Sequence, residues 1–339
     1  MKHGTGNHHF SVAIGQVPVF CLTLLGMVLG CQAQTSEPRT SAQPALTQTQ
    51  RTALPGTVEI LLDDLYRQTE RKARLAELQM LAESAFRNGE TLLKQGKQME
   101  AEAVFEKARQ ALLESDEAAF YEPTIHVTFL ELSRHVAELK GVNSPAPGTR
   151  LELSQPGQTQ VTRSVKFFKG QGFKTAFSRL KEYEPMMRQV FHEEGIPEEL
   201  IFLGLVESAY NPFARSSAGA AGIWQFMKGT GERYGLRQIG DVDERHDPEK
   251  STRAAARYLR DLFGIFRDWP LALAAYNAGE HRILRLQRQS GARDFWELSR
   301  RGLLPDETKS YVPAVLAAIT LGRNQPVSFQ RRGITVRTR

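Results

Sequence analysis

The pattern of apolar and polar positions predicts helices over most of the chain. From about Val58 to Lys140, apolar side chains recur at helical spacing among many charged ones. A second helical stretch follows beyond residue 160. In it, Asp247-Pro248-Glu249 and Pro305-Asp306-Glu307 each read as a helix start. The chain is therefore expected to be all-α.

One segment departs from the amphipathic pattern because it is apolar on every side. It runs from Leu200 to Val206 and stops on the carboxylate of Glu207. Pro197 suits the first helical position, and the residue before Pro212 is pushed out of the α region, so we expect one helix between them. A helix that is apolar all round is buried. Glu207 then lies in its last turn, near the interior.

A carboxyl group in that position should titrate abnormally. Burial and the negative end of the helix dipole both disfavour the ionised form, so the pKa of Glu207 should be raised. A carboxylic acid that stays protonated near neutral pH can serve as the general acid for a glycosidic oxygen. The alternative is a glutamate at a helix end that turns out to solvent.

Two further blocks add candidate site residues. The small residues from Gly219 to Gly222 would let the backbone approach a flat ligand. Trp224 and Phe226 beside them are expected in the core. Tyr276 follows an apolar run, so its ring should be buried and its hydroxyl needs a partner. The carboxyl group of Glu207 would serve as this hydrogen-bond partner, and a backbone carbonyl is the alternative.

Three motifs in this order resemble those of the lytic transglycosylases, a family with a goose-lysozyme-like fold. They are Glu207-Ser208, Gly222-Ile223-Trp224-Gln225-Phe226-Met227 and Ala275-Tyr276-Asn277. The similarity runs from about Val165 to Gly322 and implies a lysozyme-like catalytic domain over residues 161–325. It also implies that Glu207 is catalytic, and that the substrate is held by Ser208, Ser216, Gln225, Met227, Tyr276 and Asn277.

The reaction implied by the resemblance needs neither a cofactor nor a metal ion. Such enzymes cleave the β-1,4 bond between N-acetylmuramic acid and N-acetylglucosamine in peptidoglycan without water, and leave a 1,6-anhydro ring. A hydrolytic muramidase is an alternative and would need a second carboxylate, for which the candidates are Asp241, Asp243, Glu244 and Asp247. A non-catalytic peptidoglycan-binding adaptor is a third reading, which an intact Glu207 argues against.

The N-terminus reads as an export signal. Lys2 precedes an apolar segment from Val17 to Leu29 that ends at Gly30-Cys31, and this ending resembles the cleavage box of bacterial lipoproteins. The resemblance implies removal of residues 1–30, lipidation of Cys31, and a place at the periplasmic face of the outer membrane. A soluble periplasmic protein is the alternative. Residues 31–56, rich in Gln, Thr, Ser and Pro, should form a flexible tether.

The helical stretch over residues 57–140 resembles a single tetratricopeptide-like repeat with flanking helices at Val58–Met80 and Pro123–Lys140. The matching positions are Gly89, Leu92, Gly96, Ala101, Phe105 and Ala108. This region is expected to be either a spacer or a site for a protein partner. A linker follows at 141–160, and residues 326–339 form a basic tail. We expect the part from about Gln160 onward to carry the chemistry.

Composition adds little to this picture. The chain has 339 residues and a formal net charge of +6, which suits a polyanionic wall polymer without requiring one. No basic helix is interleaved with aromatic residues, so nucleic acid is not an expected partner. Cys21 would leave with the leader, and the mature chain would then have no disulfide.

Overall fold

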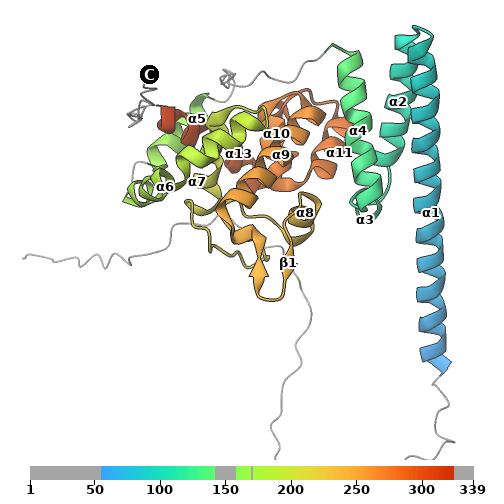
Figure 1. Cartoon of the computed structure of the whole chain (residues 1–339), viewed down its shortest axis with the longest axis horizontal. Helices are drawn as coiled ribbons and strands as arrows, with labels where there is room; N and C mark the ends of the chain where they lie inside the picture. The colour runs from blue at the N-terminus through green and yellow to red at the C-terminus, as the bar shows by residue number, and fades with distance from the viewer. Residues whose placement is uncertain (1–54, 142–157, 169–170, 324–339) are drawn as a thin grey trace, which may run out of the picture.

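The computed structural model describes residues 55–141, 158–168 and 171–323 (Figure 1). The predicted leader (1–30), Cys31 and the basic tail (326–339) lie outside the described residues, as do almost all of the tether (31–56) and the linker (141–160). Those assignments therefore stay predictions.

The all-α class is confirmed. Most described residues lie in helices, and the named strands among them form one short hairpin, β1 (Gln238–Ile239) with β2 (Val242–Asp243). None of the helices in the described ranges combines the length and the apolar composition needed to pass through a bilayer.

The N-terminal helical region consists of α1 (Pro55–Lys94), α2 (Gln98–Leu113), the single turn α3 (Glu117–Phe120) and α4 (Pro123–Leu139). The side chains of Asp116 and Glu122 cap α3 and α4 by accepting from backbone N–H groups. A Cβ atom at Gly89 would lie 2.3 Å from the ring of Phe105, so the glycine is what lets α1 and α2 pack closely. The assignment of these helices to a tetratricopeptide repeat stays a prediction.

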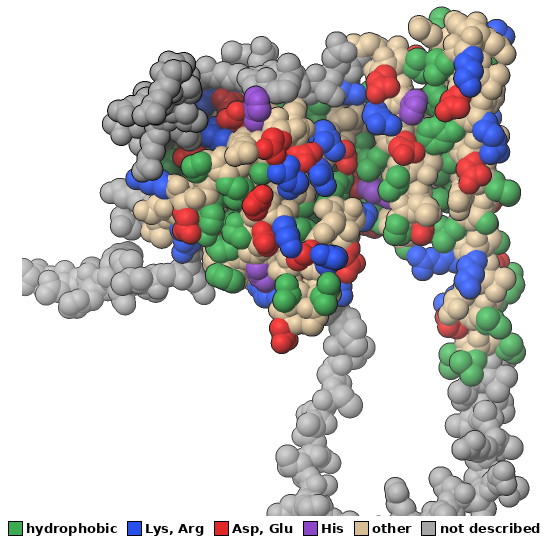
Figure 2. All heavy atoms as spheres, viewed as in Figure 1, with side chains coloured by type: hydrophobic (Ala, Val, Ile, Leu, Met, Phe, Trp, Pro, Cys, Tyr) green, Lys and Arg blue, Asp and Glu red, His purple; other side chains and the backbone are tan. Residues whose placement is uncertain are grey.

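The first helix is longer than the sequence pattern suggested. The helix predicted to end at Met80 continues without interruption to Lys94, so the flanking helix and the first half of the repeat are one element. Its first turns expose Ile60, Leu61 and Leu65. Over the face drawn in Figure 2, basic and acidic side chains are interspersed, so the net charge does not gather into a patch of one sign there.

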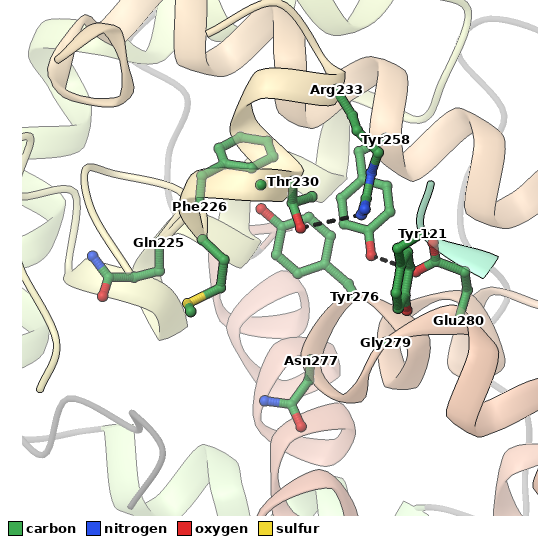
Figure 3. A pocket seen from close by; sticks show the side chains of 12 residues that line it. Tyr121, Gln225, Phe226, Thr230, Arg233, Tyr258, Tyr276, Asn277, Gly279 and Glu280 are labelled. Carbon is green, nitrogen blue, oxygen red and sulfur yellow. Dashed lines mark hydrogen bonds between the residues drawn. The ribbon is translucent and has the colours of Figure 1, made fainter. Parts of the chain in front are cut away.

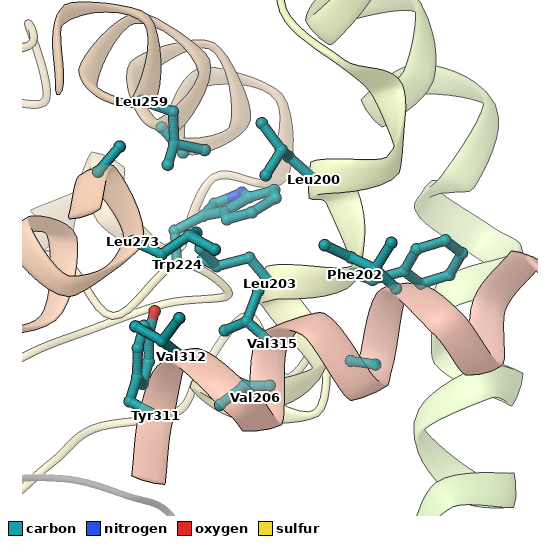
Figure 4. Close-up of a cluster of buried hydrophobic side chains, with 14 of the residues drawn as sticks. Leu200, Phe202, Leu203, Val206, Trp224, Leu259, Leu273, Tyr311, Val312 and Val315 are labelled. Atoms are coloured by element: carbon teal, nitrogen blue, oxygen red, sulfur yellow. The ribbon is translucent and has the colours of Figure 1, made fainter. Parts of the chain in front are cut away.

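The C-terminal part contains the helices α5 (Gln158–Phe168), α6 (Gln171–Glu193), α9 (Pro248–Phe266), α10 (Trp269–Ala278), α11 (Glu280–Ser290), α12 (Phe295–Arg300) and α13 (Asp306–Arg323). Both predicted helix starts are confirmed: Asp247 caps α9, and α13 begins at Asp306. These helices bury one apolar cluster, in which α13 packs against the segment that carries Glu207 (Figure 4).

The apolar segment before Glu207 is helical, but its ends differ from the prediction. It opens as a 3-10 helix, η3 (Glu198–Phe202), and becomes α-helical only in α7 (Leu203–Ser208). It ends because Ala209 and Tyr210 have φ of 52° and 58°, and the Tyr210 N–H bonds the Gly204 carbonyl at 3.1 Å. Termination by Pro212 is thus wrong, since the chain has already left the helix.

The N-terminal helical region and the C-terminal part share an apolar face. Leu284 of α11 is buried in the same cluster as the side chains of α1, α2 and α4. On that face, the Nε2 atom of His281 lies 3.1 Å from the carbonyl oxygen of Leu113, and Arg288 pairs with Glu114. Helix α4 also packs against α9. Figure 1 shows the resulting arrangement, with α2 and α4 beside α11.

Candidate active site

Glu207 lies in the last turn of α7 and is 8% exposed, as the apolar run predicted. Burial raises the pKa of its carboxyl group to about 8, and the negative charge of Glu307 adds to the rise. A hydrogen bond from Tyr311 acts in the opposite direction but does not outweigh burial. At neutral pH the carboxyl group therefore holds its proton, as a general acid must.

Tyr311, on α13, is the hydrogen-bond partner of this acid. Its hydroxyl donates to Oε1 of Glu207, and its ring is 2% exposed. Sequence reasoning missed it, although a signal was present. Tyr311 stands among the apolar residues of a helix, and the argument that a buried tyrosine needs a partner applies to it as well as to Tyr276.

Tyr276, on α10, does not bond Glu207. Its hydroxyl donates to the carbonyl oxygen of Trp224 at 2.9 Å, so the expected pairing is wrong and the backbone alternative holds. Burial raises the pKa of both Tyr276 and Tyr311, and the charge of Glu207 is the second cause of the rise for each. Both rings therefore lie near the carboxyl group of Glu207. What could not be read from the sequence is which of the two tyrosines reaches the carboxyl group.

Asn277 ties α10 to the start of α13. Its amide donates to Glu307 at 3.2 Å and its oxygen accepts from Thr308 at 2.8 Å. Asn277 thereby fixes the carboxylate of Glu307, which is the acidic group that acts on the pKa of Glu207. The third motif is thus linked to the carboxyl group of Glu207 through Glu307.

The loop after α7 is held largely by its own hydrogen bonds. Ser208 donates to the carbonyl of Ile223 at 2.8 Å, and Ser216 accepts from the N–H of Ala220 at 2.9 Å. Both hydroxyl groups were predicted to hold sugars, but in this structure each ties one part of the loop to another. Trp224 and Phe226 are buried in the core, which confirms the prediction for both.

Gly222 and Arg245 fix the shape of the loop. Gly222 has a φ of 82°, and a Cβ atom there would lie 1.9 Å from the carbonyl oxygen of Arg245. Arg245 donates in turn to the carbonyls of Gly219 and Phe226, at 2.9 and 2.8 Å. Gly222 is therefore required by the close approach of two backbone segments, whereas a Cβ atom at Gly219 would meet open space.

The acidic run considered for a second carboxylate has other roles. Arg245 lowers the pKa of Asp243 to about 2, and Lys250 lowers that of Glu244 to about 2. Asp247 caps α9, and Asp241 is exposed at the hairpin turn. None of these four carboxylates is paired with Glu207.

A cavity of about 300 Å³ is lined by Tyr276, whose pKa is raised by the charge of Glu207 in addition to burial (Figure 3). Four of the predicted substrate residues line it: Gln225, Met227, Tyr276 and Asn277. Met227 is 44% exposed at its edge, whereas Gln225 is buried with its amide donating to the Gly222 carbonyl at 2.8 Å. Glu207 is not among the lining residues. The cavity is our candidate for the substrate groove.

Comparison with known proteins agrees with this geometry. Residues 188–299 match the family model of the transglycosylase SLT domain. Membrane-bound lytic murein transglycosylase D of Escherichia coli strain K12 is 44% identical over 137 residues, which are 39% of this chain and 29% of that protein. Peptidoglycan transglycosylase gp16 of Escherichia phage T7 is 34% identical over 125 residues, 36% of this chain and 10% of that protein.

Among solved structures, the 70 kDa soluble lytic transglycosylase Slt70 from Escherichia coli aligns with 18% identity and a TM-score of 0.38, over 71% of this chain and 46% of that one. The matched segments span less than a third of the length of either curated relative named above.

Proposed function

We propose that this chain, whose residues 188–299 match the family model of the transglycosylase SLT domain, is a peptidoglycan lytic transglycosylase. It would cut the β-1,4 bond between N-acetylmuramic acid and N-acetylglucosamine without water and leave a 1,6-anhydromuramoyl end. The observation that supports this most directly is Glu207, a buried carboxylic acid whose pKa of about 8 keeps it protonated at neutral pH. The names of the two relatives given above point to the same reaction class.

In the first step, Glu207 donates its proton to the glycosidic oxygen as the bond from that oxygen to C1 breaks. N-acetylglucosamine leaves with a new hydroxyl, and the acetamido oxygen of the muramoyl residue supports the electron-poor C1 atom. Tyr311 occupies Oε1 of Glu207, which leaves Oε2 to carry the proton.

In the second step, the same group acts as the base. The Glu207 carboxylate removes the proton from the C6 hydroxyl of the muramoyl residue, the C6 oxygen attacks C1, and the anhydro ring closes. The acid is thereby restored in its protonated form. One carboxyl group serves both steps, so no second carboxylate takes part.

A hydrolytic muramidase is the competing reading, since it would use a second carboxylate to activate water. Asp243, Glu244 and Asp247 are each engaged in an ion pair or a helix cap, as described above. Glu307 acts on the pKa of Glu207, but it is bound to the amide of Asn277. A non-catalytic adaptor is disfavoured because binding alone does not require a buried, protonated acid.

Mass spectrometry of the products released from purified peptidoglycan tests the proposal. Anhydro ends are lighter by one water than hydrolytic ends, so the two reactions give different masses from the same substrate. We expect anhydro products only. Reducing muramoyl ends would show the hydrolytic reaction instead, and no release at all from the folded protein would favour the adaptor.

For the cellular site, we propose the periplasmic face of the outer membrane, with a lipid anchor at Cys31. The lipoprotein-like ending at Gly30-Cys31 supports this, and the E. coli relative is described as membrane-bound. A soluble periplasmic protein is the alternative. A protein partner for the helical region is a further prediction.

A further inference from the structure

The cavity beside the active site continues past Tyr276 and Asn277 to a second end (Figure 3). Three parts of the catalytic domain line this end: Thr230 and Arg233 on α8, Tyr258 on α9, and Gly279-Glu280 at the start of α11. Tyr121, which follows α3 in the helical region, also lines it. The region before the catalytic domain therefore supplies part of the cavity wall.

Tyr121 makes two close approaches across this boundary. A Cβ atom at Gly279 would lie 2.9 Å from its hydroxyl oxygen, so the helical region reaches the residue that ends α10, two positions after Asn277. Its ring also lies beneath the guanidinium group of Arg233, at 4.6 Å from the ring centre. An aromatic face at that distance attracts a cation and orients its plane.

Arg233 has hydrogen-bonding capacity that its surroundings do not use. Its Nη2 atom donates to Thr230 at 3.3 Å, but its buried Nε–H has no partner among the described residues. No carboxylate in the described ranges forms an ion pair with Arg233 either. Arg188 is different: it also lies over an aromatic ring, that of Phe202, but it forms ion pairs with Glu184 and Glu198. The charge of Glu280 acts on this guanidinium group without forming an ion pair with it, and a guanidinium group that lines a cavity with a free N–H donor is suited to bind an anion.

Glu280 lines the same end and is held there by Tyr258 through one of its two carboxyl oxygens. Its Oε2 accepts from the Tyr258 hydroxyl at 2.9 Å, and its Oε1 lies 3.4 Å from Nε2 of His126 in the helical region. Burial raises the pKa of Glu280, while the charge of Arg233 opposes the rise. Burial lowers the pKa of His126 to about 3, and neither Glu280 Oε1 nor His126 Nε2 has a hydrogen-bond partner among the described residues, so this approach is not an ion pair. Glu280 also forms no ion pair with Arg233, whose Nε–H stays free.

We propose that this end of the cavity is a subsite for a carboxylate on the substituent of muramic acid, bound by Arg233 and shaped by Tyr121 from the helical region. The inference rests on the proposed function, because it takes peptidoglycan as the substrate. The carboxylate can come from the stem peptide, or from the lactyl group that is exposed when the peptide is removed. Neutral sugar rings offer no such charge, so the subsite distinguishes the muramoyl residue from N-acetylglucosamine.

The test compares full-length Arg233→Gln with the wild-type protein on matched glycan strands: peptide-bearing, peptide-free, and each of these after its carboxylates have been converted to methylamides. Lys228→Gln is the control, because Lys228 lies on the same helix, carries the same charge and is 64% exposed outside the cavity. Melting temperatures establish that each variant is folded.

We expect Arg233→Gln to lower kcat/KM by about 10- to 100-fold on strands that carry the bound carboxylate, mainly through KM, as loss of a charged hydrogen bond predicts. The amidated strands should be cut equally by the variant and the wild type, and Lys228→Gln should leave all substrates unchanged. A loss confined to peptide-bearing strands identifies the stem peptide as the source. A loss confined to peptide-free strands identifies the lactyl group.

Tyr121 tests the contribution of the helical region. Tyr121→Leu removes the aromatic platform and should reproduce the selective rise in KM, whereas Tyr121→Phe keeps the ring and should stay near wild type. Equal losses for Arg233→Gln on amidated and unmodified strands, or no loss on any strand, would overturn the subsite. Neither result touches the proposed function, which fails only if the wild type forms no anhydro ends from the unmodified strands.

Discussion

Replacing Glu207 by glutamine removes the proposed proton donor and keeps the volume of the side chain. The amide can still accept the hydrogen bond from Tyr311, so the surroundings of the site should stay intact. It cannot deliver a proton. Loss of a general acid costs about 10²–10⁴ in rate, and here the loss should be larger because one group acts in both steps.

The same substitution should stabilise the protein, and by an amount that depends on pH. The pKa of Glu207 is about 8 in the folded protein and 4.5 ordinarily. Because the folded state holds the proton more tightly, ionisation costs stability as pH rises from the lower value to the higher. The penalty is absent below about pH 4, on the order of 3 kcal/mol at pH 7, and on the order of 5 kcal/mol above pH 8.

Glutamine carries no such penalty. We therefore expect the variant and the wild type to melt at similar temperatures at pH 4, and the variant to melt about 5 to 10 °C higher at pH 7. The difference should be larger still at pH 8.5. Thermal melts at these pH values, with anhydro products quantified by mass spectrometry, measure both effects on the same samples. Glu90→Gln, an exposed change on α1, is the control and should alter neither.

Two results would refute this reasoning. Near-normal turnover by Glu207→Gln would show that the proton comes from another group. An equal change in melting temperature at pH 4 and pH 8.5 would show that burial does not raise the pKa of this acid, even if activity were lost.

Four other changes test separate parts of the structure. Tyr311→Phe removes the bond that lowers the pKa of Glu207, so turnover should fall by about tenfold and the alkaline limb of the pH–rate profile should move upward; an unchanged profile would contradict this. Tyr276→Phe leaves the Trp224 carbonyl without its donor, so calorimetry should show a loss of about 1–3 kcal/mol with the pH profile unchanged. Gly222→Ala should destabilise by about 3 kcal/mol or more in denaturant titrations, against about 1–2 kcal/mol for Gly219→Ala, which has a similar φ but open space around it. Cys31→Ser should move the protein from the membrane to the soluble fraction, and a wholly soluble wild type would defeat the lipid anchor.

Local patterns predicted the elements that depend on neighbouring residues. Asp247 and Asp306 mark helix starts through side chains that act within one turn, and the structure has both. The burial of Glu207 also followed from the sequence, because an apolar run with no polar face can only lie inside. These inferences needed no knowledge of what packs against the segment.

The pairings across the fold could not be predicted in the same way. Tyr276 and Tyr311 are both buried tyrosines near the acid, and only the packing of α13 against α7 decides that Tyr311 reaches it. The roles expected for Ser208 and Ser216 came from motif resemblance, which does not show that their hydroxyl groups bond the loop. The contact of Tyr121 with Gly279 joins positions far apart in the chain, and no periodicity carries that information.

The face shared by α11 and the helical region bears on how this protein can be divided. The family match covers residues 188–299 only, and it leaves out Tyr311 and the helices that cover Leu284. A fragment starting near Gln160, which the sequence suggested would be self-sufficient, exposes that leucine and loses one wall of the cavity. If the proposed catalytic domain were transferred to another protein, its α11 would therefore need a neighbouring region of compatible shape to cover it. Without such a region, the surface of α11 would itself have to change.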